Sequence, residues 1–205
     1  MLFGGETLSN RYSWLEIDLL LGDYEAGFNH IPEENGSRLI LFLGSTIGNF
    51  EQDHAIRFMN DLRANMSSSD RLLVGFDRVK DARILNAAYN DKEGVTAAFN
   101  LNVLNVLNNE LSANFDPENF EHSAHYDTEK SQVEMHLVSS CTHLVTLSTL
   151  STTIEIRTGE RIRTEISRKF TNKSLHNLLG QAELDVEQDF VSSDGYFSLV
   201  LAKPV

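Results

Sequence analysis

The chain has 205 residues, 41% of them hydrophobic and 23% charged, which indicates a folded domain with a hydrophobic core rather than a disordered chain. Its 17 basic and 30 acidic side chains give a formal net charge of −13, which repels phosphate backbones and argues against nucleic-acid binding. No apolar run approaches the length of a bilayer span, so we expect no membrane partner, and the single cysteine, Cys141, favours a reducing cytoplasm.

The first part of the chain predicts one strand–helix–strand unit. Residues 1–10 are expected to be a weakly structured lead-in, and residues 17–21 a short strand. The unbroken apolar run 39–43 predicts a strand covered on both faces, and a glycine-rich loop follows it over residues 44–49. Apolar residues then recur at helical spacing over 56–66, and a second buried strand over 72–76 ends at Asp77.

The pattern changes after this second strand. Residues 81–113 are predicted to be helical, and two-residue alternation predicts strands over 133–137, 153–157 and 161–167. Residues 158–160 predict a tight hairpin connection between the last two of these strands. A helix over 174–182 and an antiparallel hairpin formed by 186–191 and 196–201 close the chain. We interpret 79–169 as an α+β insertion in a Rossmann-like α/β core made of 1–78 and 170–205.

Ligands in open α/β sheets bind beyond the carboxyl ends of the strands, which indicates two candidate loops. In the loop 44–49 the glycines permit close approach of a ligand, and Asn49 offers both a donor and an acceptor. The alternative is a tight strand-to-helix turn in which Asn49 caps the helix. Asp23 and Tyr24 follow the first predicted strand, where they either face an adenosine or form a surface turn.

The strand predicted over 161–167 carries a second group of polar side chains. Residues two apart share a face of a strand, so Arg161, Arg163, Glu165 and Ser167 are expected to point the same way. A carboxylate beside a hydroxyl suits a cationic or nitrogen-rich ligand; the alternative is a solvated face with a cross-strand ion pair. Met135, at the centre of another strand, is expected to be core packing.

Four histidines lie close together in the sequence, at positions 122, 125, 136 and 143. A zinc site needs three or four ligands at close spacing, and neither a cysteine pair nor two histidines four apart around a glutamate are found. We therefore expect no metal site.

Five segments of the chain match a known family in the correct order. They are 42–49 (FLGSTIGN), 75–81 (GFDRVKD), 88–100 (AYNDKEGVTAAFN), 133–135 (VEM) and 163–170 (RTEISRKF). Over about residues 22–201 the sequence resembles the histidine-specific, S-adenosylmethionine-dependent N-methyltransferases of ergothioneine biosynthesis. The resemblance implies a partial class I methyltransferase (Rossmann-like) sheet, with residues 79–169 as an inserted α+β substrate-binding domain.

The same resemblance implies an activity and a set of site residues. The expected reaction transfers methyl groups from S-adenosyl-L-methionine, the donor, to the α-amino nitrogen of L-histidine, giving trimethylhistidine. The implied substrate residues are Asn49 for the amino and carboxylate end and for catalysis, Tyr89 and Thr96 for the carboxylate, Glu165 and Ser167 for the imidazole, and Met135 for the pocket wall. The implied donor residues are Gly44, Asp23 and Tyr24, where Tyr24 replaces a phenylalanine of the family.

The chain departs from the family pattern at its beginning. The glycine-rich donor loop that precedes these motifs in the family has no counterpart over residues 1–18. We therefore expect a truncated form with impaired donor binding and activity. The alternative is a non-catalytic remnant that acts as an amino-acid-binding or protein-interaction module.

Overall fold

The computed structural model describes residues 2–22, 28 and 36–205, and the chain divides into two compact units, residues 1–33 and 34–205. The first unit contains helix α1 (Leu2–Arg11), where the sequence predicted a weakly structured lead-in. The strand predicted over 17–21 is also wrong, because these residues have no regular structure, and leucines 19–21 are exposed without a paired strand in the described part of the chain. Asp23 and Tyr24 lie outside the described residues.

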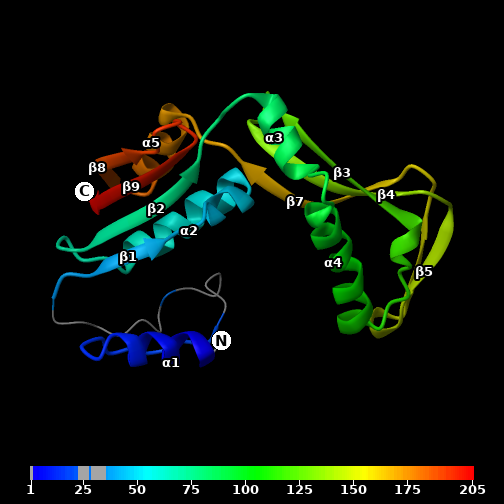
Figure 1. Cartoon of the computed structure of the whole chain (residues 1–205), viewed down its shortest axis with the longest axis horizontal. Helices are drawn as coiled ribbons and strands as arrows, with labels where there is room; N and C mark the ends of the chain where they lie inside the picture. Colours follow the sequence, from blue (N-terminus) through cyan, green and yellow to red (C-terminus); the bar gives the residue numbers. More distant parts are fainter. Residues whose placement is uncertain (1, 23–27, 29–35) are drawn as a thin grey trace. The chain divides into compact units, whose positions relative to one another are not determined.

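The second unit contains a four-stranded sheet in the order β1-β2-β9-β8 (Figure 1). Its strands are β1 (Leu39–Phe42), β2 (Arg71–Asp77), β8 (Leu184–Val191) and β9 (Phe197–Pro204). β1 and β2 pair in parallel and are joined through helix α2 (Gln52–Ala64), so the predicted strand–helix–strand unit is confirmed. β2 pairs antiparallel with β9, and β9 pairs antiparallel with β8, as predicted for the closing hairpin.

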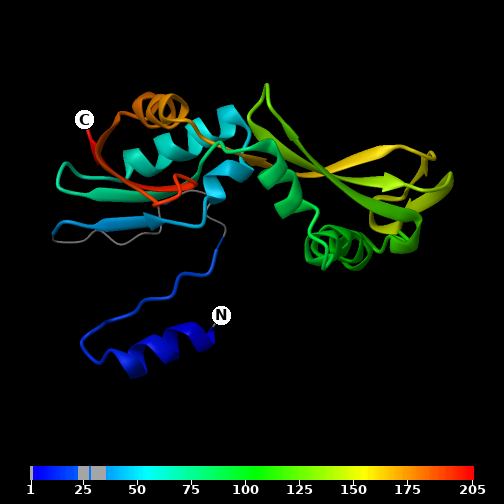
Figure 2. The ribbon, with the colours of Figure 1, turned by 45° about the horizontal axis from the view of Figure 1, so that its top comes forward.

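Helices α2 and α5 (Asn172–Gln181) lie on the same side of this sheet (Figure 2). Phe42 of β1 packs on Phe58 of α2 with the ring centroids 4.7 Å apart. α5 begins with a capping box, in which Thr171 and Ser174 each accept a hydrogen bond from the other's backbone N–H. The buried apolar side chains of both helices face the sheet, and the core of the unit lies between the helices and the sheet.

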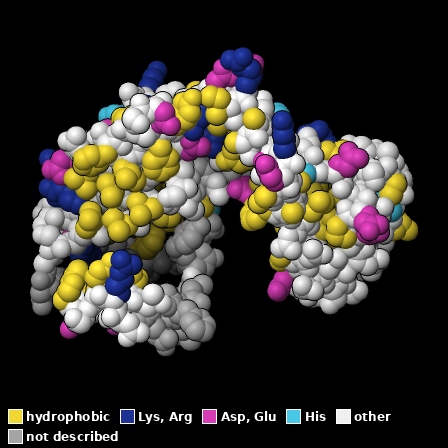
Figure 3. Space-filling model, in the orientation of Figure 1, with side chains coloured by type: hydrophobic (Ala, Val, Ile, Leu, Met, Phe, Trp, Pro, Cys, Tyr) yellow, Lys and Arg dark blue, Asp and Glu magenta, His cyan; other side chains and the backbone are white. Residues whose placement is uncertain are grey.

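The prediction that β1 is covered on both faces is wrong among the described residues. Leu39 is 58% exposed and Leu41 is 55% exposed, and the β2 residues paired with them, Arg71 and Leu73, are half-buried. The residues of β2 that share the face of Phe42 are fully buried, because the helices cover only that face. Hydrophobic side chains accordingly gather at the surface over this sheet (Figure 3).

The region predicted to be helical over 81–113 forms two helices, α3 (Ala82–Tyr89) and α4 (Val95–Leu111). The helical conformation is interrupted between them, because Asp91 accepts hydrogen bonds from the N–H groups of Val95 and Thr96 and Gly94 adopts a φ of +71°. Among the described helices, none combines the length and apolar character needed to cross a membrane.

Two smaller antiparallel sheets follow α4. The first has the order β3-β4-β7, and the second pairs β5 with β6. Their strands are β3 (Phe120–Asp127), β4 (Gln132–Ser139), β7 (Arg161–Arg168), β5 (His143–Leu147) and β6 (Thr152–Ile156); the short 3-10 helices are η2 (Thr46–Asn49), η3 (Pro117–Asn119) and η4 (Ser148–Leu150). The hairpin predicted between 153–157 and 161–167 is wrong, because the N–H of Gly159 bonds to the carbonyl of Ser139 and directs the chain onto β4.

The chain leaves and rejoins the four-stranded sheet at neighbouring points. Arg78 and Phe170 form an isolated parallel bridge, and the N–H of Phe170 donates to the carbonyl of Asp77 at 2.8 Å. The N–H of Val79 donates in turn to the carbonyl of Phe170 at 3.2 Å. Residues 79–169 therefore start and end side by side at the carboxyl end of β2.

Candidate functional site

The loop after β1 is held at two points by residues distant in the sequence. Ser45, in the left-handed conformation, accepts a hydrogen bond on its Oγ from the N–H of Asp77 at 2.8 Å. Gly48 lies so close to β7 that a Cβ added there would be 2.8 Å from the carbonyl oxygen of Arg168. The loop that ends at Asn49 therefore lies directly against the strand that carries Ser167, although about 120 residues separate them.

Replacing Gly48 with alanine is expected to lower the free energy of unfolding by roughly 1–3 kcal/mol, because the new methyl group would overlap backbone that has little room to move. Chemical denaturation measures the change. The matched control is Gly180→Ala in α5, where no atom lies within 4 Å of the added Cβ and alanine should stabilise the helix by roughly 0.5–1 kcal/mol. Equal effects at the two positions would contradict the close contact at Gly48.

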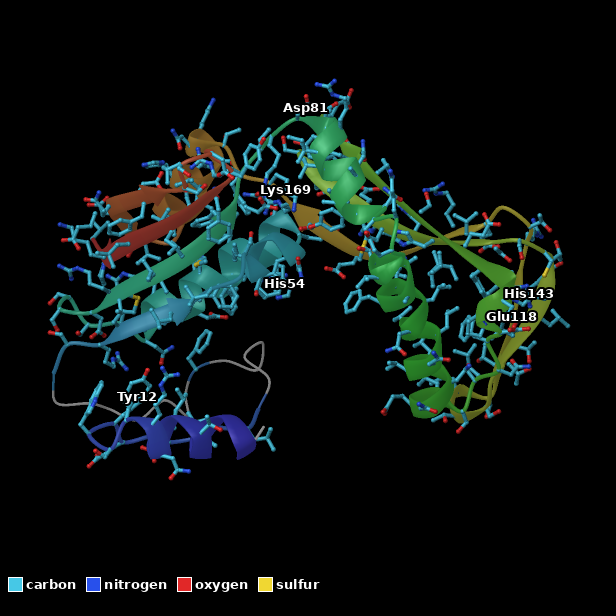
Figure 4. All side chains as sticks on the ribbon, in the orientation of Figure 1. Tyr12, His54, Asp81, Glu118, His143 and Lys169 are labelled. Atoms are coloured by element: carbon cyan, nitrogen blue, oxygen red, sulfur yellow. The ribbon has the colours of Figure 1, made fainter. Side chains whose placement is uncertain are left out.

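A buried lysine joins the end of β7 to β2 and α3. The ammonium nitrogen of Lys169 lies 2.7 Å from Oδ2 of Asp77, 2.9 Å from the hydroxyl of Tyr89 and 2.8 Å from Oγ of Ser167. The Tyr89 hydroxyl itself donates to Oγ of Ser167 at 2.8 Å. Figure 4 shows Lys169 at the junction between the four-stranded and the three-stranded sheet. Tyr89 and Ser167, both predicted from the sequence, are thus in direct contact.

A β-bulge in β7 decides which of its side chains lie on the same face of the sheet as Met135. Glu165 pairs with Met135 across the ladder, whereas the next pair joins Arg163 to His136, which leaves Thr164 as the extra residue. Because Met135 and His136 point to opposite faces of β4, Glu165 and Arg163 also lie on opposite faces. The prediction that Arg161 and Arg163 share a face with Glu165 and Ser167 is therefore wrong.

Met135, Glu165 and Ser167 remain on one face. Met135 is buried, and Ser167 pairs with the neighbouring Val133 of β4, so both positions of β7 face the same side as Met135. The bulge is fixed by the Thr164 hydroxyl, which hydrogen-bonds to the side chain of Asn100 on α4 and to the carbonyl of Met135.

The Glu165 carboxylate borders a cavity of about 220 Å³ between β7 and α4. The residues that line it are Phe99, Asn100, Asn102, Val103, Val106, Thr164 and Glu165. The carboxylate of Glu165 has no hydrogen-bond or ion-pair partner among the described residues, although its backbone belongs to the β4–β7 ladder. Burial raises its pKa, and the positive charge of Lys169 acts in the opposite direction. An acceptor without a partner at the edge of a cavity is suited to binding a ligand N–H.

Asn49 and Thr96 occupy different settings. Asn49 is exposed at the end of η2, where its amide has no partner in the part of the chain that the structure describes. Thr96 bonds through both its backbone N–H and its side chain to Asp91, which lowers the pKa of that carboxyl to about 2. No described hydrogen bond joins Thr96 to Tyr89 or Ser167, so its predicted substrate contact stays a prediction.

The predicted donor residues are only partly within the described chain. Gly44 is exposed and has a φ of +76°, and only the Thr46 hydroxyl lies within 4 Å of a Cβ added there. A backbone of this kind beyond the carboxyl end of a parallel strand fits one wall of a donor site. Asp23 and Tyr24, predicted as the adenine contacts, cannot be placed beside it because they lie outside the described residues.

The sequence interpretation missed the roles of Asp77, Lys169 and Asn100. A signal for Lys169 was present, because Glu165, Ser167 and Lys169 continue the two-residue alternation of β7 onto one face. Asn100 had no such signal. Its contacts reach His122 and the carbonyl of His136, which are distant in sequence and meet only when α4 packs on the sheet.

Two of the four histidines meet on the opposite face of the three-stranded sheet. His125 and His136 surround Glu134, and their candidate ligand atoms all lie within 4.8 Å of one another. The Glu134 carboxylate is already bound by Lys130 and Gln132, each at 2.8 Å. Burial, with the nearby Arg161 as a second cause, lowers the pKa of His136. The expected absence of a metal site stays a prediction.

Residues 4–204 of the chain match the family described as histidine-specific, SAM-dependent methyltransferases. The chain belongs to this family. It is 39% identical over 198 residues to a histidine N-alpha-methyltransferase of Mycolicibacterium smegmatis, a match that covers 97% of this chain and 61% of that protein. It is also 31% identical over 176 residues to an L-tryptophan methyltransferase of Psilocybe serbica, covering 80% of this chain and 48% of that protein.

Membership in this methyltransferase family confirms the resemblance seen in the five motifs, the enzyme class and S-adenosylmethionine as the methyl donor of the family. The chain spans about three fifths of the length of the histidine methyltransferases that it matches. Among solved structures, a SAM-dependent methyltransferase from Clostridium acetobutylicum aligns with 99% of this chain and 70% of its own at a TM-score of 0.47 and 12% identity, too low a score to decide the fold. The mixed α/β fold rests on the sheet described above.

Proposed function

We propose that this histidine-specific methyltransferase family member binds L-histidine at the junction of β7 with the η2 loop, for transfer of methyl groups to the α-amino nitrogen that yields trimethylhistidine. The observation that carries the proposal is the contact of Gly48 with Arg168, which puts Asn49 beside the strand of Glu165 and Ser167. The matched relatives named histidine N-alpha-methyltransferases support the same substrate.

The imidazole would lie against the shared face of β4 and β7. Glu165 accepts a hydrogen bond from one ring nitrogen, Ser167 bonds to the other, and Met135 packs against the ring plane. An amino acid without the two imidazole nitrogens would leave Glu165 and Ser167 without hydrogen-bond partners. A site of this kind rejects such an amino acid by up to about 10⁴-fold. In this proposal residues 79–169 form the substrate-binding domain, and 1–78 with 170–205 form the methyltransferase core.

The amino end of the substrate would lie at the η2 loop. The donor supplies an electrophilic sulfonium methyl group. In the first two transfers the Asn49 carbonyl accepts an N–H of the neutral amine and directs its lone pair at the methyl carbon; the N–C bond forms as the C–S bond breaks, and the ammonium proton leaves to water. The tertiary amine of the third transfer has no N–H, so it is positioned by the carboxylate and imidazole contacts of the substrate, and its quaternary product has no proton to lose. Asn49 adds no negative charge that would favour the protonated amine. Thr96 binds the carboxylate directly, and Tyr89, whose hydroxyl hydrogen is donated to Ser167, binds it through a water molecule. Positioning of this kind supplies much of the rate enhancement.

Isothermal titration calorimetry with L-histidine, L-tryptophan, L-leucine and S-adenosylmethionine tests the proposal. We expect L-histidine to bind most tightly among the amino acids. We expect S-adenosylmethionine to bind weakly, because in the described chain β1 is an edge strand and Gly44 forms only one wall of the donor site. Preference for another amino acid would contradict the histidine assignment, and tight donor binding would contradict the proposed impairment.

A second candidate is a non-catalytic amino-acid-binding or protein-interaction module. The exposed apolar side chains of β1 and α4 favour it, because such patches on a folded surface often mark interaction sites. The side chains concerned are Leu39, Leu41, Val95, Phe99 and Val106. This candidate predicts histidine binding without any incorporation of labelled methyl groups.

A further inference from the structure

The side chain of Lys169 is the best-connected buried charge beside the candidate site. It is 1% exposed, and its three N–H groups meet three acceptors, on Asp77, Tyr89 and Ser167. An ammonium group removed from water must have its charge and its donors satisfied, and here the carboxylate of Asp77 supplies the opposite charge. Asp77 also accepts from Lys80 at 2.6 Å, so its position is fixed from both sides.

The contacts of Lys169 fix the direction of the Ser167 hydroxyl. A serine oxygen has two acceptor lone pairs and one hydrogen to donate. Oγ of Ser167 accepts from the Lys169 ammonium and from the Tyr89 hydroxyl, so both lone pairs are used. A phenol is a better donor than an aliphatic alcohol, and the Tyr89 oxygen already accepts from Lys169, which supports this direction. The hydrogen of Ser167 therefore remains for a ligand.

Glu165 supplies the complementary group two residues away on the same face of β7. An ionised carboxylate only accepts hydrogen bonds. Ser167 does not line the cavity beside Glu165, but the face shared by β4 and β7 offers one fixed donor, the Ser167 hydroxyl, and one acceptor, the Glu165 carboxylate. A neutral imidazole matches this pair, because one of its nitrogens accepts and the other carries a hydrogen. An imidazolium has two N–H groups, one of which would meet the hydroxyl hydrogen of Ser167.

We propose that Lys169 is a positioning residue that holds Ser167 as a hydrogen-bond donor and thereby makes the pocket select the neutral imidazole of histidine over the imidazolium. This inference rests on the proposed binding of histidine at β7. Lys169 does not touch the substrate. It acts through Ser167, and its positive charge also disfavours a second cation in the pocket.

The test compares the dissociation constant of L-histidine at about pH 7.5 and about pH 5.5, on either side of an imidazole pKa of about 6.5. In the wild-type chain the affinity should fall about tenfold at the lower pH, as the neutral fraction falls. In Lys169→Met the Ser167 hydroxyl is free to turn and accept, so the ratio should shrink to about twofold. Affinity at the higher pH should fall about tenfold, the cost of roughly one hydrogen bond.

Other ionisable groups face this network and are common to both proteins. They are Asp77 and Lys80 at the end of β2, Tyr89 on α3, His122 on β3 and Glu165 on β7. The comparison of ratios removes the contribution of the groups that titrate alike in both proteins. Glu165 does not, because the charge of Lys169 lowers its pKa; loss of that charge raises the Glu165 pKa and would enlarge the ratio, opposite to the decrease expected from a freed Ser167 hydroxyl. Lys169→Arg, which keeps a cation and several donors, should restore the wild-type ratio.

A double-mutant cycle separates positioning from a general structural role. At about pH 7.5, where the imidazole is neutral and the charge of Lys169 opposes no second cation, Ser167→Ala with Lys169→Met should bind histidine no more weakly than Ser167→Ala alone, because Lys169 then acts through that hydroxyl. If the two substitutions lower histidine affinity additively and the pH ratio is unchanged, the inference about Lys169 is overturned, whereas the proposed binding of histidine at β7 is not. Wild-type protein that does not bind histidine would overturn the proposed function and this inference with it. If Lys169→Met does not fold by circular dichroism, Tyr89→Phe decides, because freeing one lone pair of Ser167 should also reduce the pH ratio.

Discussion

Replacing Asn49 with alanine is expected to abolish transfer of labelled methyl groups to L-histidine, with the rate falling at least about 100-fold, because the amine loses the carbonyl that orients its lone pair. In the proposed donor site only Gly44 lies among the described residues and forms one wall, so the wild-type rate is itself expected to be low. The assay therefore uses the 205-residue chain in excess over labelled S-adenosylmethionine and follows a single turnover. Asn177→Ala, an exposed asparagine of α5, is the matched control and should leave the rate unchanged.

Binding measurements test whether the loss of activity in Asn49→Ala arises at the amino end of the substrate. Asn49→Ala should weaken L-histidine about tenfold, the cost of roughly one hydrogen bond, and should leave imidazolepropionate, which has no amino group, unaffected. Equal loss for both ligands would show that the substitution displaced the loop instead. A wild-type chain that binds histidine and transfers no methyl group would favour the non-catalytic candidate.

The sequence was sufficient for the elements whose signals are local. The apolar runs at 39–43 and 72–76 with a helix between them predicted the parallel pair β1 and β2, and the closing hairpin was equally clear. The coverage of β1 was not predictable in this way, because an apolar run does not reveal whether distant parts of the chain cover one face of the strand or both. The partner of β6 also depended on a tertiary contact, between Gly159 and Ser139.

In the candidate site, too, local patterns predicted some features, whereas others depend on tertiary contacts. Periodicity placed Glu165 and Ser167 on one face, and this holds because both lie on the same side of the bulge. It misplaced Arg163 because one extra residue, Thr164, reverses every side chain beyond it. The bulge depends on Asn100, a helix residue some sixty positions away, so a strand pattern read by itself contains no sign of it. The close approach of Gly48 to Arg168 was likewise outside the reach of local patterns.

Glu165 should have the largest effect on histidine affinity. Replacing it with alanine is expected to weaken binding roughly 10- to 100-fold, because a hydrogen bond to a charged group contributes about 1.5–3 kcal/mol. Preference for histidine over tryptophan should fall by a similar factor, since tryptophan makes no use of the pair of Glu165 and Ser167. Glu187→Ala is the control. Glu187 lies on the outer strand β8, away from β7, and its carboxylate pairs with Arg71 of β2.

The pH dependence of the same variants distinguishes a binding carboxylate from a structural one. Burial raises the pKa of Glu165, so in the wild type the carboxylate loses its charge as the pH falls through that raised value, and histidine affinity falls because the hydrogen bond to a charged acceptor becomes one to a neutral group. Glu165→Gln keeps the shape and one acceptor oxygen, so it should bind about tenfold more weakly than wild type and lose this part of the pH dependence. If Glu165→Ala binds histidine as the wild type does, the carboxylate lies outside the binding site. If Glu165→Gln keeps the full pH dependence, the titrating group is another one, and the acceptor in the pocket must be sought elsewhere on the face shared by β4 and β7.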